Sequence, residues 1–344
     1  VTVQALDADP VEFVGSWSTG GNLNTARRYL AGCGIQTAAL GIGGYTGGGA
    51  PGRVGIVEQY NGTSWTEIAD LNTSRTNLSA CGITTAAIVS GGRIAPGPAT
   101  GATEQWNGSS WTEVSDLGTA RYSSSEVGTS TAAIFFGGAP SGSPVALNES
   151  WDGSSWTEVN DLNEGGGNIS GFGTSTAAIG AGGYGRSSDV ESWNGSSWTE
   201  TAEVNTARSG HGGSSGLQTE GLIYGGTPGF KANTEAWNGS SWSEVADLAT
   251  ARRLAGSTDG TAGTTAAIFG GMTPPGTAAT EEWSFPPPTS VALTEGDVFL
   301  SGGTTLKGFG KAAGVPSATW ASGGAMNTAR YGSGAAGTTQ NASL

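Results

Sequence analysis

The sequence predicts an all-β fold, a six-bladed β-propeller closed by a strand from the front of the chain. Three observations predict it. A motif containing Ser-Ser-Trp-Thr-Glu or a near copy recurs about every 45 residues. Each period offers four short strand-like segments, with no helical periodicity. The last period lacks its fourth segment, and a matching one stands near the N-terminus. Four-stranded units at this period are typical of propeller blades.

The first blade shows the order of elements within a unit. Its first strand is predicted around Tyr29–Gly34, and its second is the Thr-Ala-Ala-Leu run that ends before Gly43-Gly44. The third carries Glu58-Gln59-Tyr60, and the fourth carries Ser-Trp-Thr-Glu-Ile. Asn-Gly between the third and fourth segments supplies the positive φ of a tight hairpin turn. The motif tryptophans are separated by 46, 45, 42 and 44 residues and are Trp65, Trp111, Trp156, Trp198 and Trp242.

The number of blades follows from the glycine pairs that end each second strand. There are six pairs: Gly43-Gly44, Gly91-Gly92, Gly137-Gly138, Gly182-Gly183, Gly225-Gly226 and Gly270-Gly271. After Trp283 the sixth unit runs into prolines, with no further Asn-Gly or Ser-Trp-Thr-Glu. Residues 11–19, which contain Trp17, resemble a lone fourth strand. We expect them to complete blade six, since a closed ring leaves no exposed sheet edge.

These elements divide the chain into four parts. Residues 1–10 are a lead-in, 11–285 the propeller, 286–290 a Pro-rich linker, and 291–344 a β-hairpin extension followed by the start of a further propeller-like repeat. The segment Trp320–Tyr331 repeats the pattern that opens at Trp17. Two interpretations remain: a second propeller in a longer protein, or a half-blade that packs on a neighbouring subunit.

Composition limits the partners. The formal net charge is −14 over 344 residues, which opposes binding to nucleic acid or to an anionic membrane surface. No apolar run reaches the roughly 18 residues that a transmembrane helix needs, so we expect no membrane insertion. The only two cysteines, Cys33 and Cys81, occupy the same place in adjacent repeats. We interpret them as small residues packed near the axis, with a disulfide as the alternative.

Residues that could carry chemistry mostly recur once per blade, which favours structural roles. The only histidine, His211, is interpreted as a polar residue of an inner strand. An arginine repeats after each unit except before blade four, and we interpret it as a loop brace. Glutamates on the fourth strands are interpreted as charges that prevent edge pairing. We therefore predict no catalytic residue, no metal site and no cofactor; a calcium site in a loop is an open alternative.

Variation is concentrated in the loops between second and third strands. Antiparallel strands place these loops and the inter-blade connections on one face of the disc. A uniform scaffold with variable loops on one face is how repeat proteins present a recognition surface. The loops are 45–57, 93–103, 139–148, 184–190, 227–234 and 272–280. The predicted ligand contacts are Tyr45, Arg53, Arg93, Tyr184, Arg186, Phe230 and Lys231.

The Gly pair, the Glu-x-aromatic, the later Trp and the Arg beyond it resemble kelch repeats, which implies a kelch-type propeller over about residues 11–285. The nearly exact copies of Trp-Asn-Gly-Ser-Ser-Trp-Thr-Glu-Val resemble repeat tracts of virion proteins in tailed bacteriophages. That resemblance implies a non-enzymatic protein of the virion surface, a tail fibre or similar appendage, that attaches to a host-surface glycan or receptor. Its partners would be other virion or appendage proteins, or further copies of itself. The alternatives are an extracellular or cell-surface bacterial adhesion or filament protein and, less favoured, a polysaccharide-active enzyme. A sialidase-like arginine site at the axis has little support.

Overall fold

The computed structural model describes residues 15–285, except 48–51, 95–96, 211, 261–262 and 274–275, and two further strands at 298–301 and 305–308. The predicted lead-in, the Pro-rich linker, His211 and the repeat-like segment at Trp320 lie outside the described residues. Among the described residues, no helix is long and apolar enough to cross a membrane.

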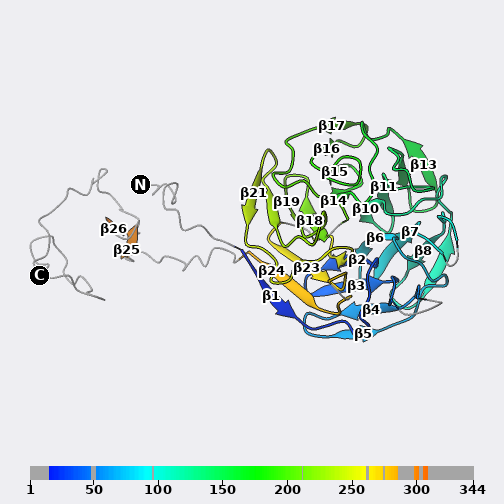
Figure 1. Cartoon of the computed structure of the whole chain (residues 1–344), viewed down its shortest axis with the longest axis horizontal. Helices are drawn as coiled ribbons and strands as arrows, with labels where there is room; N and C mark the ends of the chain where they lie inside the picture. The colour runs from blue at the N-terminus through cyan, green and yellow to red at the C-terminus, as the bar shows by residue number, and fades with distance from the viewer. Residues whose placement is uncertain are drawn as a thin grey trace, which may run out of the picture. The chain divides into compact units, whose positions relative to one another are not determined.

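Six four-stranded antiparallel sheets form the ring that the sequence predicts (Figure 1). Within each blade the first strand lies near the centre of the ring and the fourth at its rim. Blade one comprises β2 (Ala31–Ile35), β3 (Ala38–Ile42), β4 (Val57–Tyr60) and β5 (Trp65–Glu67). Blade two comprises β6 (Ser79–Ile83), β7 (Ala86–Ser90), β8 (Thr103–Trp106) and β9 (Trp111–Val114). Blade three comprises β10 (Ser125–Thr129), β11 (Ala132–Phe136), β12 (Asn148–Trp151) and β13 (Trp156–Val159). Blade four comprises β14 (Ser170–Thr174), β15 (Ala177–Ala181), β16 (Val190–Trp193) and β17 (Trp198–Glu200). Blade five comprises β18 (Gly213–Leu217), β19 (Glu220–Tyr224), β20 (Thr234–Trp237) and β21 (Trp242–Val245). Blade six comprises β22 (Gly256–Ser257), β23 (Thr265–Phe269), β24 (Thr280–Ser284) and β1 (Ser16–Gly20).

Blade six is closed by the N-terminal strand, which confirms the sequence prediction. Strand β1 pairs antiparallel with β24, with Trp17 opposite Trp283. Blade one secures this joint. The hydroxyl of Tyr60 donates to the carboxylate of Glu282 at 2.5 Å and accepts from the backbone N–H of Gly21 at 3.2 Å. The first and last strands of the ring are therefore held together by more than their own ladder.

Local signals in the repeat explain the hairpins at the rim. Gly62 has φ of 87° in the turn between β4 and β5, and the side chain of Asn61 accepts backbone N–H bonds from Thr63 and Ser64, each at 2.9 Å. Across this hairpin the two aromatic rings stack. The ring centroids of the third- and fourth-strand aromatics lie 4.9–5.4 Å apart in blades one to five.

The hydrophobic core is divided among the blade interfaces. Six clusters of buried residues each join two neighbouring blades, so every interface has its own core. In one of them, Phe136 of blade three packs with Trp198 of blade four, with centroids 4.8 Å apart. Fourth-strand glutamates such as Glu67 and Glu113 are exposed at the rim, as expected of charges that discourage edge pairing.

Each blade is braced by a buried Arg–Glu ion pair. In blade one the guanidinium of Arg27 binds the Glu58 carboxylate and donates to the carbonyls of Thr25 at 3.1 Å, Gly41 at 2.8 Å and Gly43 at 2.9 Å. The brace thus joins the entry to the blade, the end of the second strand and the start of the third. The six pairs are Arg27–Glu58, Arg75–Glu104, Arg121–Glu149, Arg186–Glu191, Arg208–Glu235 and Arg252–Glu281. The loop-brace interpretation of the repeat arginines is confirmed.

A ring of backbone hydrogen bonds surrounds the axis beside these braces. Two positions after each repeat arginine position, the backbone adopts a left-handed conformation. At five of these six positions the N–H donates to the carbonyl of the preceding blade, as from Asn77 to Tyr29 and from Ser123 to Asn77, both at 2.9 Å. The ring residues are Tyr29, Asn77, Ser123, Asn168, Gly210 and Leu254. This ring fixes the starting points of the inter-blade connections around the axis.

The strands β25 (Val298–Ser301) and β26 (Thr305–Gly308) lie in the segment predicted as a hairpin extension. They pair antiparallel, with Val298 opposite Gly308. They belong to a compact unit separate from the propeller.

Candidate binding surface and axial cavity

The loop face is the side of the disc that carries the second-to-third-strand loops and the inter-blade connections. Short backbone bridges tie the two sets of segments together near the axis. Tyr45 bridges to Arg28 and to Arg53, and Arg93 bridges to Thr76 and Ala99. The first residues of these two loops are therefore held by the scaffold.

Six of the seven predicted contact residues lie on the loop face with side chains that reach the surface. Tyr184 is the most accessible of them, with 63% of its surface exposed. The others, which are half-buried, are Tyr45, Arg53, Arg93, Phe230 and Lys231.

The prediction that Arg186 is a surface contact is wrong. Its side chain is buried, only 2% exposed, and pairs with Glu191. Blade four has Gly166 where the other blades have the bracing arginine. A Cβ added at Gly166 would stand 2.6 Å from Cδ of Arg186. The side chain of Arg186 therefore fills the space of the missing arginine, entering from the loop instead of from the blade entry.

The loop face also carries three stacked arginine–aromatic pairs, only partly foreseen from the sequence. The guanidinium carbon of Arg28 lies 5.0 Å from the ring centroid of Tyr45. That of Arg93 lies 4.7 Å from the Tyr122 ring, and that of Arg253 lies 5.0 Å from the Phe230 ring. Sequence reasoning missed Arg28, Arg253 and Tyr122. The doublets Arg27-Arg28 and Arg252-Arg253 were the available signal, because one arginine of each doublet exceeds what the brace needs.

A pocket of about 340 Å³ opens beside the first of these pairs. Arg28, Tyr45, Thr46 and Gly47 line it from blade one, and Gly276 lines it from the loop of blade six. Volumes of this order are typical of small-molecule sites. The pocket therefore has room for one sugar-sized group next to a guanidinium.

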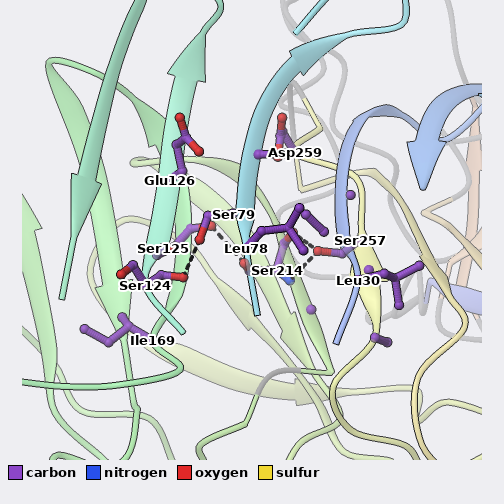
Figure 2. Close-up of a pocket in the computed structure, with 17 residues that line it drawn as sticks. Leu30, Leu78, Ser79, Ser124, Ser125, Glu126, Ile169, Ser214, Ser257 and Asp259 are labelled. Carbon is purple, nitrogen blue, oxygen red and sulfur yellow. Dashed lines mark hydrogen bonds between the residues drawn. The ribbon is translucent and has the colours of Figure 1, made fainter. Parts of the chain in front are cut away.

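An axial cavity of about 80 Å³ lies between the first strands of all six blades (Figure 2). Small side chains such as Ser79, Ser125 and Ser214 dominate its wall, and two carboxyls interrupt them, Glu126 of β10 and Asp259 after β22. Oε1 of Glu126 accepts from the hydroxyl of Ser90 at 2.9 Å, whereas Oε2 has no partner among the described residues.

Burial dominates the electrostatics of the cavity. It raises the pKa of Glu126 and of Asp259 well above the ordinary carboxyl value, because an ionised carboxyl loses its hydration there. Cys33 and Cys81 are buried and unpaired, so the packing interpretation is confirmed and the disulfide alternative is wrong. Burial also raises the pKa of both thiols, which keeps them in the unreactive protonated form.

Within the described residues, no group of three or more His, Cys, Asp or Glu side chains is arranged to hold a metal ion. Comparison with known proteins adds no relative: the chain matches no protein-family model and no curated protein sequence.

Proposed function

We propose that this protein is a non-enzymatic virion surface protein, a tail fibre or similar appendage, whose kelch-like propeller attaches to a glycan on the host surface. The loop face is the attachment surface in this proposal. The resemblance of the copied repeat tract to virion proteins of tailed phages supports the location. The propeller fold is compatible with a binding role but is shared by proteins of many functions, so the site has to carry the argument.

The contrast between a constant scaffold and one variable face carries the proposal. All six blades repeat the same Arg–Glu brace, and one blade keeps it although its arginine comes from a different segment. The loops above the braces differ in length and in the charged and aromatic residues they carry. A scaffold maintained this strictly under divergent loops suits a surface on which side chains can change without loss of the fold.

Two measurements test the proposal. Peptide mass spectrometry of the particles that contain the chain should find capsid, portal or tail proteins beside it. Only secreted or cell-surface proteins beside it would contradict the virion location and favour an adhesion or filament protein.

The second measurement is binding of the full chain to an array of bacterial surface polysaccharides. A matched pair of variants separates the two faces. Tyr184→Ala removes an exposed aromatic ring from the loop face, and Ile83→Ala removes a side chain that is 54% exposed on the opposite, turn face. We expect Tyr184→Ala to weaken binding and Ile83→Ala to leave it unchanged. No binding to any polysaccharide by the folded chain would contradict attachment through a glycan.

A further inference from the structure

The cations of the propeller fall into two sets. Six arginines are buried in the braces. Five others form no ion pair with any described residue, and each belongs to a loop or connection of the loop face. We call these five the basic arc, because they lie in the consecutive blades five, six, one and two: Lys231, Arg253, Arg28, Arg53 and Arg93.

The charge of the loop face changes sign in blade four. There Glu164 and Asp189 stand together, and the hydrogen bond and charge of Asp189 raise the pKa of Glu164. The protein as a whole has a formal charge of −14. The inter-blade connections of the same blades also carry three exposed carboxylates, Asp70, Asp116 and Asp247. The five cations of the arc outnumber them, so this sector of the loop face has a local surplus of positive charge that opposes the overall charge.

Stacking leaves the guanidinium edges of Arg28 and Arg93 open to a ligand, whereas Nη2 of Arg253 donates to Sδ of Met272 at 3.8 Å. Arg28 and Arg93 donate no side-chain hydrogen bond to a described residue, and only their Nε atoms are buried without a partner. An aromatic ring occupies one planar face of each guanidinium and holds its orientation. The terminal nitrogens then present paired N–H donors with the geometry that binds a carboxylate or sulfate in bidentate fashion.

We propose that the basic arc binds an acidic polysaccharide, and that each stacked arginine takes the carboxylate or sulfate of one sugar. The proposal rests on the proposed function, in which the loop face binds a glycan. The pocket of about 340 Å³ beside Arg28 and Tyr45 accommodates a single sugar group. Because the stacked arginines lie in separate blades, they match a polysaccharide whose charged groups are separated along the polymer by uncharged atoms.

The test is equilibrium binding of the intact chain to three immobilised probes: polygalacturonate, which carries carboxylates; dextran sulfate, which carries sulfates; and neutral dextran. The variants are Arg28→Gln, Arg93→Gln, Arg253→Gln and their combination. The matched control is Ile83→Glu, which makes the same unit change in charge at a residue 54% exposed on the turn face. Thermal unfolding of every variant verifies that it is folded.

We expect binding to at least one acidic probe and none to neutral dextran. Each single substitution should weaken binding by about tenfold, the usual effect of losing a charged hydrogen bond. The triple variant should abolish binding, and Ile83→Glu should have little effect. The carboxylate and sulfate probes identify which group the arginines take.

The contradicting outcomes separate the two proposals. Tight binding to a neutral glycan that the arginine variants keep, but that Tyr184→Ala loses, would overturn the acidic-ligand inference and leave the proposed function standing. Equal weakening by Ile83→Glu and by the arginine variants would also overturn it, because the effect would then be one of net charge. Absence of binding to any glycan, acidic or neutral, would overturn both.

Discussion

Blade four offers a direct test of the brace that holds the loop face. Replacing Arg186 with Ala removes the cation that faces the buried carboxylate of Glu191. Removing one partner of a buried ion pair costs about 3–5 kcal/mol, because the other charge stays buried without compensation. In a domain of this size, each kcal/mol corresponds to roughly 2–4 °C in Tm. We therefore expect Arg186→Ala to lower the Tm by roughly 6–20 °C.

The same geometry predicts a rescue. Gly166 stands where the other blades have their bracing arginine, and the stem of Arg186 fills the space next to it. Arg186 already approximates two carbonyl contacts of the repeat, donating to Glu164 at 3.3 Å and to Gly180 at 3.4 Å. The double variant Gly166→Arg/Arg186→Ala rebuilds the brace from the repeat position. It should recover most of the lost stability, whereas Gly166→Arg alone should destabilise by crowding the guanidinium of Arg186.

Urea and thermal unfolding of the wild type, both single variants and the double variant give the coupling free energy between the two positions. The account predicts a favourable coupling of at least about 2 kcal/mol. A double variant as unstable as the sum of the single changes would refute the equivalence of the two arginine positions. A fully stable Arg186→Ala variant would refute the structural role of the brace itself.

Three further predictions concern ring closure and the axial cavity. Tyr60→Phe removes the hydroxyl bonded to Glu282 and should lower the free energy of unfolding in urea by about 1–2 kcal/mol. Because burial and that bond raise the pKa of Tyr60 to about 12, the stabilisation should be complete below pH 10 and disappear as the pH rises through 12. An equally stable variant would contradict the role of this bond in closure. Deletion of residues 1–20 removes β1 and exposes the edge of β24. Calorimetry should then show a Tm lower by roughly 10 °C or more, and light scattering should show self-association through the exposed edge. An unchanged Tm would mean that β1 does not close the ring. Glu126→Gln removes a carboxyl whose pKa is raised by burial. The wild type should therefore lose stability as the pH rises above the ordinary carboxyl pKa, and the variant should be more stable than the wild type by about 1–3 kcal/mol at neutral pH. A variant less stable than the wild type at both pH 5 and pH 8 would show that the charged form is favoured instead.

The fold could be predicted because its signals are local and repeated. The Asn-Gly turn at Asn61 and the paired aromatic rings Tyr60 and Trp65 determine one hairpin, and their recurrence determines the number of blades. Closure was predictable too, since Trp17 is a fourth-strand residue without a blade of its own. The loops were correctly placed on one face because strand direction alone determines it.

The brace in blade four was missed because its arginine is not at the repeat position. A sequence pattern records spacing, whereas a buried carboxylate requires only that some cation reach it in space. The retained Glu191 was the available signal: a blade that keeps the glutamate and lacks the arginine needs another cation nearby, and Arg186 is five residues away. The cavity carboxyl Glu126 was missed for a related reason, since its neighbour Ser90 comes from another blade.

The central claim is that the loop face, and not the turn face, is the binding surface. Hydrogen–deuterium exchange of the intact chain, with and without the glycan that binds it most tightly, tests this claim most directly. The account predicts slower exchange in loops such as 52–57, 97–103 and 227–234, and unchanged exchange in the turns 35–38 and 83–86 on the opposite face. Protection confined to those turns, with the loops unchanged, would contradict it.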